Sequence, residues 1–215
     1  MYIPRHFEES RLDEIHRIIE TYPFAALVVQ SPAGLDATHI PFAFDASAGA
    51  HGVLQAHVSR NNALWQECKD GADVMVMFQG GDAYVSPNWY PSKHELHRQV
   101  PTWNYQIVHV HGKLRIRDDE RFVRGVVARL TRTHEARAAT PKPWKMGDSE
   151  PAYIDQLLRA IVGIEVEIER IVGASKLSQN KETRDRDGVV SALRARGNAQ
   201  TADAMVAAAI RQPAA

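Results

Sequence analysis

The stretch TWNYQIVHVHGKLRIRD, residues 102–118, decides the fold class that we predict for this chain. Its second half, HVHGKLRIR, alternates apolar and polar side chains, which is typical of a strand with one face in the core and one half exposed. The run VGIEVEIERI, residues 162–171, alternates more strictly still. Ile164, Val166 and Ile168 lie opposite Glu165, Glu167 and Glu169. We interpret the three carboxylates as a solvated strand face that discourages edge pairing, rather than as acid or base catalysts.

Shorter runs bounded by turn residues predict the remaining strands. They are FAALVVQ (24–30), THIPFAFD (38–45), VLQAHVS (53–59), ADVMVMFQG (72–80) and AYVSP (83–87). The first three predict a meander of antiparallel strands. Helices are predicted from apolar spacing and from capping or stop residues. These segments are residues 10–21, 61–71, 118–136, 149–161, 181–196 and 199–211.

The order of these elements sets the fold class. No alternation of parallel strands and helices occurs, and most helices follow the strands along the chain. This order argues against a Rossmann fold or another doubly wound sheet. We predict a mainly β protein with added helices (α+β), built on a small antiparallel barrel with helical cover.

Composition and charge narrow the class of protein. The chain has 215 residues with 26 basic and 26 acidic side chains, so no net charge attracts nucleic acid or an anionic membrane. The single cysteine, Cys68, excludes an intramolecular disulfide and a Cys-rich zinc site. The start MYIPRHFEES lacks the apolar segment of a signal peptide, and no run approaches the roughly 18–20 apolar residues of a membrane span. We expect a soluble, cytoplasmic protein with no membrane partner.

Common catalytic signatures are missing: there is no GxxxxGK[ST], no GxGxxG after a strand, no GxSxG and no HExxH. In HVSRNNALW (57–65) a predicted strand ends at Ser59, and Arg60 and Asn61 lead into a helix. A hydroxyl, a guanidinium and free N–H groups at a helix N-terminus are what a phosphate monoester needs. A plain helix cap beside an exposed arginine explains the same residues equally well.

The stretch SPNWYPSKHELHRQVPTWNY, residues 86–105, combines flat rings with directional polar groups, a mixture that suits a planar polar ligand. The rings are Trp89, Tyr90, Trp103 and Tyr105, and the polar groups are Ser86, Ser92, Lys93, Thr102 and Asn104. The alternative, slightly favoured, is a proline-fixed loop that covers a sheet end or a subunit interface. Pro91 and Pro101 disfavour a helix, so we expect His94 and His97 to lie in the loop.

Three histidines invite a metal interpretation. His109 and His111 share one strand face, and His57 lies on a neighbouring strand. No carboxylate or thiolate at matching spacing supports a metal, so we favour hydrogen-bonded strand histidines that line a pocket or an interface.

The C-terminal segment is weakly basic. Residues 176–211 hold seven basic and four acidic side chains, a surplus of three. Two predicted helices flank Gly197, as in a helix-turn-helix, yet the second one, TADAMVAAAIR, offers few side chains that read base edges. DNA is therefore a possible partner without the support of a clear motif.

Several of these stretches together resemble the PaiB-type FMN-binding negative transcriptional regulator family. They are MYIPRHFEES, THIPF, HVSRNNALW, FQGGDAYVSPNWYPSK, VPTWNYQIVHVHG, LRAIVGIEVEI and KLSQN. The resemblance runs from residue 1 to about 195, and SPNWYPSK followed by PTWNY is its most specific part. Thr38 stands where the family often has Asn, and the tail from about 197 is less typical.

The resemblance implies an antiparallel FMN-binding split β-barrel and a homodimer with flavin sites at its interface. It implies a split-barrel domain with helical insertions over residues 1–196, to which residues 197–215 add a C-terminal helical tail. Ser59, Arg60 and Asn61 would bind the FMN phosphate. Gln79, Lys93, Trp103 and Asn104 would lie near the ring or the ribityl chain. His57 is a further pocket candidate, as are His109 and His111.

Three functional hypotheses follow. The first is a negative transcriptional regulator that binds FMN. The second is an FMN-dependent oxidoreductase that uses NAD(P)H, in which the flavin transfers the electrons and no side chain is an obligatory acid or base. The third is a haem or metal protein that uses His57, His109 or His111.

Overall fold

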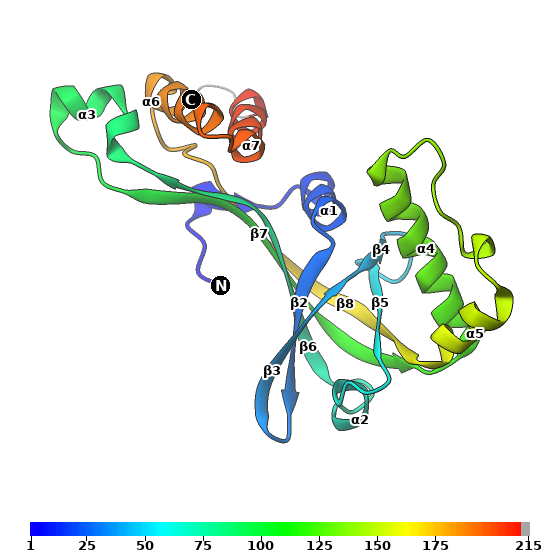
Figure 1. Cartoon of the computed structure of the whole chain (residues 1–215). Coiled ribbons are helices and arrows are strands. Elements are labelled where there is room, and N and C mark those ends of the chain that lie inside the picture. Colours follow the sequence, from blue (N-terminus) through cyan, green and yellow to red (C-terminus); the bar gives the residue numbers. More distant parts are fainter. Residues whose placement is uncertain (212–215) are drawn as a thin grey trace. The chain divides into compact units, whose positions relative to one another are not determined.

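A computed structural model describes residues 1–211, so the last four residues of the predicted tail 197–215 lie outside the described residues. Eight strands within the described chain form one sheet (Figure 1). They are β1 (Glu8–Glu9), β2 (Phe24–Ser31), β3 (Gly34–Pro41), β4 (Ala43–Asp45), β5 (Val53–Ser59), β6 (Asp73–Val85), β7 (Thr102–Arg117) and β8 (Ile161–Lys176). The antiparallel pairings confirm the predicted mainly β fold with added helices.

The helices lie between and after the strands. The α-helices are α1 (Leu12–Thr21), α2 (Leu64–Glu67), α3 (Pro91–Leu96), α4 (Glu120–Ala138), α5 (Pro151–Arg159), α6 (Thr183–Ala195) and α7 (Ala199–Arg211). Short 3-10 helices are η1 (Arg5–Phe7), η2 (Pro87–Trp89) and η3 (Met146–Asp148).

The predicted meander is present, but its middle strand is broken. The run THIPFAFD divides at Phe42, so that β3 pairs with β2 and β4 pairs with β5. The strand order is β3-β2-β6-β7-β8-β5-β4, and its two ends, β3 and β4, are consecutive in sequence. Phe42 is buried, and its backbone N–H donates to the Pro23 carbonyl at 2.9 Å. The chain therefore passes directly from one edge strand to the other, and β3 also contacts β5.

The chain forms two compact units, which are described separately. Unit 1 consists of Met1–Ile18, Gln79–Val108 and the chain from Val172 onward. Unit 2 consists of Ile19–Phe78 and His109–Ile171. The long strands β6, β7 and β8 contribute residues to both units.

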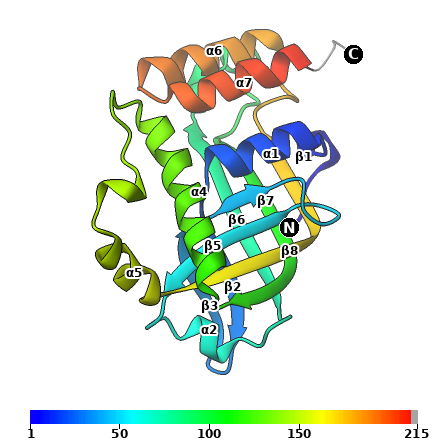
Figure 2. The same ribbon diagram turned by 90° about the vertical axis from the view of Figure 1, so that its right-hand side faces the viewer.

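Unit 2 holds an apolar core between its strands. Its fully buried side chains include Leu27, Leu54, Val76, Phe78, Val110, Leu114, Ile164 and Val166. Helix α4 lies across β5 (Figure 2), capped at its start by Asp119, whose carboxylate accepts from the Phe122 N–H at 2.8 Å. A Cβ at Gly163 would come within 2.5 Å of the Phe122 ring, so glycine is what allows this close helix approach.

The row of carboxylates on β8 departs in part from its prediction. Glu167 and Glu169 are exposed, as expected for a solvated strand face. Glu165 is only 13% exposed because Gln55 donates to it at 2.7 Å and Arg117 pairs with it at 3.0 Å. It is thus part of a packed polar cluster rather than of the solvated face.

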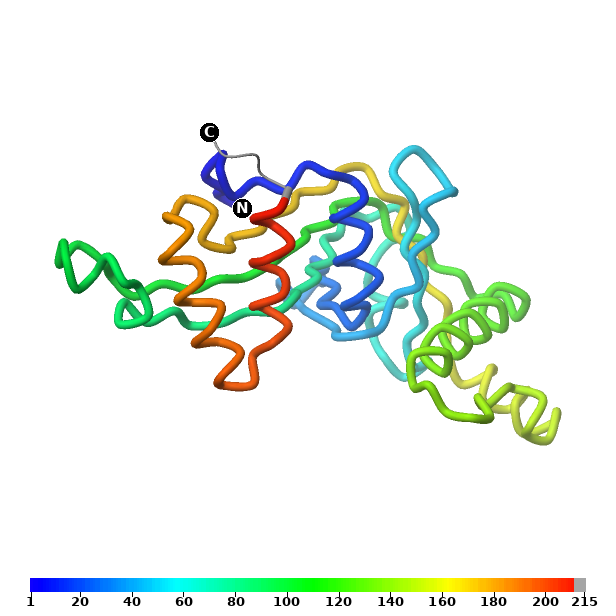
Figure 3. The backbone as a smooth tube through the Cα atoms, turned by 90° about the horizontal axis from the view of Figure 1, so that it is seen from above, coloured from blue at the N-terminus to red at the C-terminus, as the bar shows by residue number. Residues whose placement is uncertain are grey.

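Unit 1 has its own core beneath α6 and α7, which lie side by side (Figure 3). The buried members are Ala83, Val85, Tyr90, Leu177, Val189, Leu193, Ala202 and Met205. The prediction that His94 and His97 lie in a loop is wrong for His94, which belongs to α3. Pro91 starts this helix, where a missing N–H costs nothing, and His97 ends it with a left-handed backbone (φ 53°).

Candidate functional site

The turn after β5 carries the first group of predicted site residues, Ser59, Arg60 and Asn61, and lies in unit 2. The Ser59 hydroxyl accepts from the Asn61 N–H at 3.2 Å, and its carbonyl accepts from the Asn62 N–H at 2.9 Å. The Asn62 side chain in turn accepts from the Leu64 N–H at 2.9 Å. The free N–H groups expected at a helix start are therefore largely used within the turn.

The guanidinium of Arg60 is not a free cation. It donates to both carboxylate oxygens of Asp118, at 2.9 and 2.5 Å, and to the carbonyls of Arg159 and Ile161. Arg60 lowers the pKa of Asp118 through these hydrogen bonds, which favour the carboxylate. Trp65 lies beside the guanidinium and donates its ring N–H to the Arg60 carbonyl. Both charged groups keep contact with solvent, so a phosphate would bind Arg60 by displacing Asp118.

His57 and Gln55 bring two unsatisfied polar atoms to β5. The two residues are two apart and so share one face of the strand. Within the described chain, His57 Nδ1 and Gln55 Oε1 are buried and have no hydrogen-bond partner. Burial lowers the pKa of His57, which keeps the ring neutral. Gln55 was not predicted as a site residue.

Three residues predicted near the flavin ring lie on the surface of unit 1. Gln79 donates to Asp82 at 2.9 Å, and Lys93 donates to Asn88 at 2.7 Å. Trp103 is 54% exposed and meets Tyr84 edge to face, with ring centroids 6.0 Å apart. About half of the Trp103 side chain is thus accessible to a ligand.

Asn104, the fourth residue of that group, is fully buried instead. It accepts from the Ser178 hydroxyl at 3.1 Å, and its amide donates to the Met205 sulfur at 3.2 Å. It lines a cavity of about 180 Å³ together with Phe7, Tyr90, Val100, Pro101, Thr102, Lys176, Ser178, Asn180 and Lys181. The loop 86–105 and the KLSQN segment meet in this cavity, which is called the Tyr90 pocket below.

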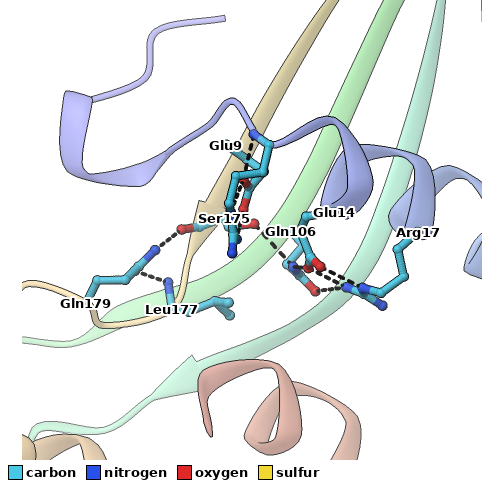
Figure 4. A network of polar contacts seen from close by, with 8 residues as sticks. Glu9, Glu14, Arg17, Gln106, Ser175, Leu177 and Gln179 are labelled. Atoms are coloured by element: carbon cyan, nitrogen blue, oxygen red, sulfur yellow. Dashed lines mark hydrogen bonds and ion pairs between the residues drawn. The ribbon is translucent and has the colours of Figure 1, made fainter. Parts of the chain in front are cut away.

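A second polar network joins β1, α1, β7 and β8 within unit 1 (Figure 4). Gln106 donates from one amide nitrogen to Glu14 at 3.1 Å and to Ser175 at 3.2 Å. Arg17 pairs with Glu14 at 2.7 Å, and Arg11 pairs with Glu9 at 2.5 Å. Both glutamates are buried with their charge balanced, so the network fixes the N-terminal segment on the sheet.

Sequence reasoning predicted Asn104 as a site residue but not its burial, and it missed Gln106, Glu14 and Ser175. The signal was present, because Asn104 and Gln106 occupy alternate positions of a predicted strand and so share its inward face with Val108 and Val110. Polar side chains in such a row indicate a buried network or a pocket.

The metal interpretation finds no ligand set in the part of the chain that the structure describes. No three His, Cys, Asp or Glu side chains in residues 1–211 gather closely enough to hold a metal ion. Burial lowers the pKa of His109 and of His111, so both rings favour the neutral form. His57, His109 and His111 are thus strand histidines that do not converge.

Comparison with known sequences places the chain in a family. Residues 1–170 match the family described as "Putative FMN-binding domain". The protease synthase and sporulation protein PAI 2 of Bacillus subtilis is 32% identical over 193 residues, which span 90% of this chain and 89% of that protein. An uncharacterized protein of Saccharomyces cerevisiae is 32% identical over 154 residues, or 63% of this chain and 90% of that protein.

Solved structures share the fold at low identity. The flavocytochrome Anf3 from Azotobacter vinelandii superposes with a TM-score of 0.55 at 13% identity, over 86% of this chain and 78% of that one. The FAD and haem binding protein from Mycobacterium smegmatis gives 0.53 at 14% identity, over 84% and 78%. The fold is that of the flavin-binding split barrels.

The chain belongs to the PaiB-type FMN-binding family, and FMN is the cofactor of that family. No helix in residues 1–211 is long and apolar enough to cross a membrane. The residues present fit a phosphate-bearing flavin in one respect, since the turn after β5 offers a hydroxyl, an amide and a solvent-accessible guanidinium.

Proposed function

We propose that this protein is a PaiB-type negative transcriptional regulator that binds FMN, with the FMN phosphate at Ser59, Arg60 and Asn61. The observation that carries the proposal is the Arg60 guanidinium, which is held at the end of β5 by an exchangeable carboxylate partner, in a chain of the FMN-binding family. A phosphate monoester, like the carboxylate of Asp118, can accept two parallel hydrogen bonds from a guanidinium.

Bound FMN supplies one- and two-electron redox chemistry. The residues of the chain bind and orient it. Arg60 and the hydroxyl and amide beside it, in unit 2, hold the phosphate, and the exposed Trp103 of unit 1 suits stacking with the flavin ring of the partner subunit in the proposed dimer. Gln79 and Lys93 supply polar groups for the ring edge or the ribityl chain, whereas Asn104, which is fully buried and bonded to Ser178 and Met205, is left out of the proposed flavin site. We further propose a cytoplasmic homodimer with its flavin sites at the interface and a single split-barrel domain with a C-terminal helical tail.

The charges on α6 and α7 support regulation without an extended basic surface. Arg184 pairs with Glu95 at 2.7 Å and with Glu182 at 2.8 Å. Arg194 pairs with Asp203 at 2.8 Å. Glu182 and Asp203 are already counted in the surplus of three basic side chains, so only Glu95 reduces that surplus. A surplus this small favours regulation through protein contacts over direct DNA readout.

A titration of FMN tests the proposal. The Arg60→Ala variant should bind FMN roughly tenfold or more weakly, because charge-assisted hydrogen bonds to the phosphate are lost. The Asp118→Asn variant should bind FMN more tightly, because the competing carboxylate charge is removed. Flavin fluorescence quenching measures both, and Arg159→Ala is a control because Arg60 contacts only its backbone carbonyl.

Equal affinity in wild type and Arg60→Ala would remove this turn from the flavin site. Further assays on the FMN-loaded protein distinguish the transcriptional regulator from the oxidoreductase. Salt-dependent, sequence-preferring DNA binding or a change in target transcription supports the regulator. Rapid NAD(P)H oxidation without either effect would replace it with the oxidoreductase. Light scattering of the purified protein measures the proposed dimer.

A further inference from the structure

The Tyr90 pocket combines positive charge with an apolar wall. Its lining contains two lysines and no carboxylate, while Phe7, Tyr90, Val100 and Pro101 supply rings and aliphatic carbon. Among residues 1–211, neither Lys176 nor Lys181 forms an ion pair. The buried carboxylate of Asp185 reaches Lys181 only through Gln99, which accepts from Lys181 and donates to Asp185 at 3.3 Å.

Each lysine is fixed in place while keeping hydrogen-bond capacity. Lys176 donates to the Thr102 hydroxyl and to the Trp103 carbonyl, which uses two of its three protons. Lys181 donates to Gln99 at 2.7 Å and lies 5.2 Å from the centre of the Tyr90 ring. Burial, aided by the neighbouring charge of Lys181, lowers the pKa of Lys176. A bound anion would relieve this repulsion.

The hydroxyl of Tyr90 is the second, independent observation. The residue is fully buried, and within the described chain its oxygen has no partner in hydrogen-bonding geometry. Burial raises the pKa of Tyr90, the Ser178 hydroxyl, which lies close but outside hydrogen-bonding geometry, lowers it, and the charge of Asp185 raises it further. Ser178 itself has a left-handed backbone (φ 63°), a conformation that costs a non-glycine residue energy and recurs at ligand sites. An unsatisfied buried donor is costly unless something accepts from it.

We propose that the Tyr90 pocket binds a small carboxylate with an apolar body, in a site that does not require the flavin. Lys176, Lys181 and the Tyr90 hydroxyl bind the carboxylate, and the apolar wall contacts the body. The cavity of about 180 Å³ is close in size to the roughly 150 Å³ cavity that holds benzene in an engineered protein. It is far smaller than the roughly 300 Å³ at which sites for drug-sized ligands begin.

Calorimetric titration of the full chain, with and without FMN, tests this site with three matched probes. Benzoate carries both charge and apolar body, benzyl alcohol lacks the charge, and acetate lacks the body. We expect saturable binding of benzoate, and binding at least tenfold weaker for each of the other two. Equal binding of benzyl alcohol, or no saturable binding of benzoate up to ~10 mM, would overturn the proposal.

Variants then assign the contacts. Lys181→Met should weaken benzoate binding roughly tenfold, and the exposed Lys142→Met control should leave it unchanged. Tyr90→Phe should weaken it about threefold or more while keeping or raising the thermal unfolding temperature, since an unsatisfied hydroxyl is removed. A purely structural tyrosine would leave the affinity unchanged.

Competition distinguishes this site from the proposed flavin site. Benzoate should bind equally well to the Arg60→Ala variant, whether or not that variant binds FMN. Displacement of benzoate by FMN would assign the pocket to the flavin and end the proposal. The proposal would also be overturned if inorganic phosphate bound with the same dissociation constant as benzoate, because the pocket would then be a general oxyanion site.

Discussion

In unit 2 the inward row of β7 is apolar, with Val110 and Leu114 fully buried, whereas in unit 1 the same row contains Asn104 and Gln106. Strand β8 buries Val162, Ile164 and Val166 in unit 2, and in unit 1 it buries the polar Ser175, which does not follow their alternation. One strand thus supplies an apolar core in unit 2 and polar pockets in unit 1. The alternation of a strand predicts which side chains are buried. Where those buried side chains are polar, they need polar partners, and this indicates a network or a pocket instead of an apolar core.

The difference predicts that the two units lose stability by different mechanisms. In unit 2, removing apolar volume leaves a cavity. In unit 1, removing a polar group leaves another polar group without its partner. Three changes, from the largest expected effect to the smallest, test this contrast.

Leu114→Ala should cost about 3 kcal/mol of unfolding free energy, because it opens a cavity in a fully buried part of unit 2. Urea unfolding followed by far-UV circular dichroism measures the loss. Leu35→Ala, at a leucine that is 78% exposed in the same unit, is the control and should change little. A loss at Leu114 as small as at Leu35 would contradict a close-packed core.

Gln106→Leu should cost about 1–3 kcal/mol although it adds no cavity, because Ser175 and Glu14 each lose a hydrogen bond in a buried setting. Amide hydrogen exchange should rise first in β1 and the start of α1. The same substitution at the exposed Gln200 is the matched control in unit 1. A stabilised Gln106→Leu variant would mean that the network is a burden on folding rather than a support.

The smallest expected effect is the loss of stability at acidic pH that results from protonation of His57. Burial lowers the folded-state pKa of His57 below its ordinary 6.5, so the unfolded chain takes up the proton first as pH falls. The stabilising effect of a neutral His57 is complete above pH 6.5 and is lost as pH falls below it. Each proton of this kind contributes at most about 1.4 kcal/mol per pH unit.

The difference between the unfolding free energies at pH 7.5 and at pH 5 should therefore be smaller in the His57→Gln variant than in wild type. Some slope should remain, because burial lowers the pKa of His109 and of His111 as well. An identical slope in both proteins would show that His57 titrates alike in the folded and unfolded chains.

Local sequence patterns were sufficient for the elements of the fold. Strands β2, β5, β7 and β8 were predicted from alternation and turn residues, and α6 and α7 from apolar spacing on either side of Gly197. The break at Phe42 was not predicted, because the alternation of THIPFAFD was given more weight than Pro41, which lacks a backbone N–H and marks the end of β3. Helix α3 was missed because Pro91 was taken as a helix breaker, whereas proline is tolerated in a first turn.

For the candidate sites, too, some features were predicted from the sequence and others were seen only in the structure. The sequence drew attention to Ser59 and Arg60, and to the loop 86–105, because rare combinations of residue types are visible without a structure. It could not show that Asp118 already occupies the guanidinium of Arg60, 58 positions along the chain. Both Trp103 and Asn104 were predicted near the flavin ring or ribityl chain, but the structure shows that Trp103 is exposed and Asn104 is buried.

By itself, then, the sequence determined the mainly β fold, the family and the FMN cofactor of that family, since these depend on local patterns and on resemblance. Only the tertiary structure decided which polar groups are satisfied and which are not. Lys176 and Lys181, which form no ion pair within the described residues, lie 86 and 91 positions after Tyr90, yet all three line one pocket. Hydrogen bonds and charge compensation act through space rather than along the sequence.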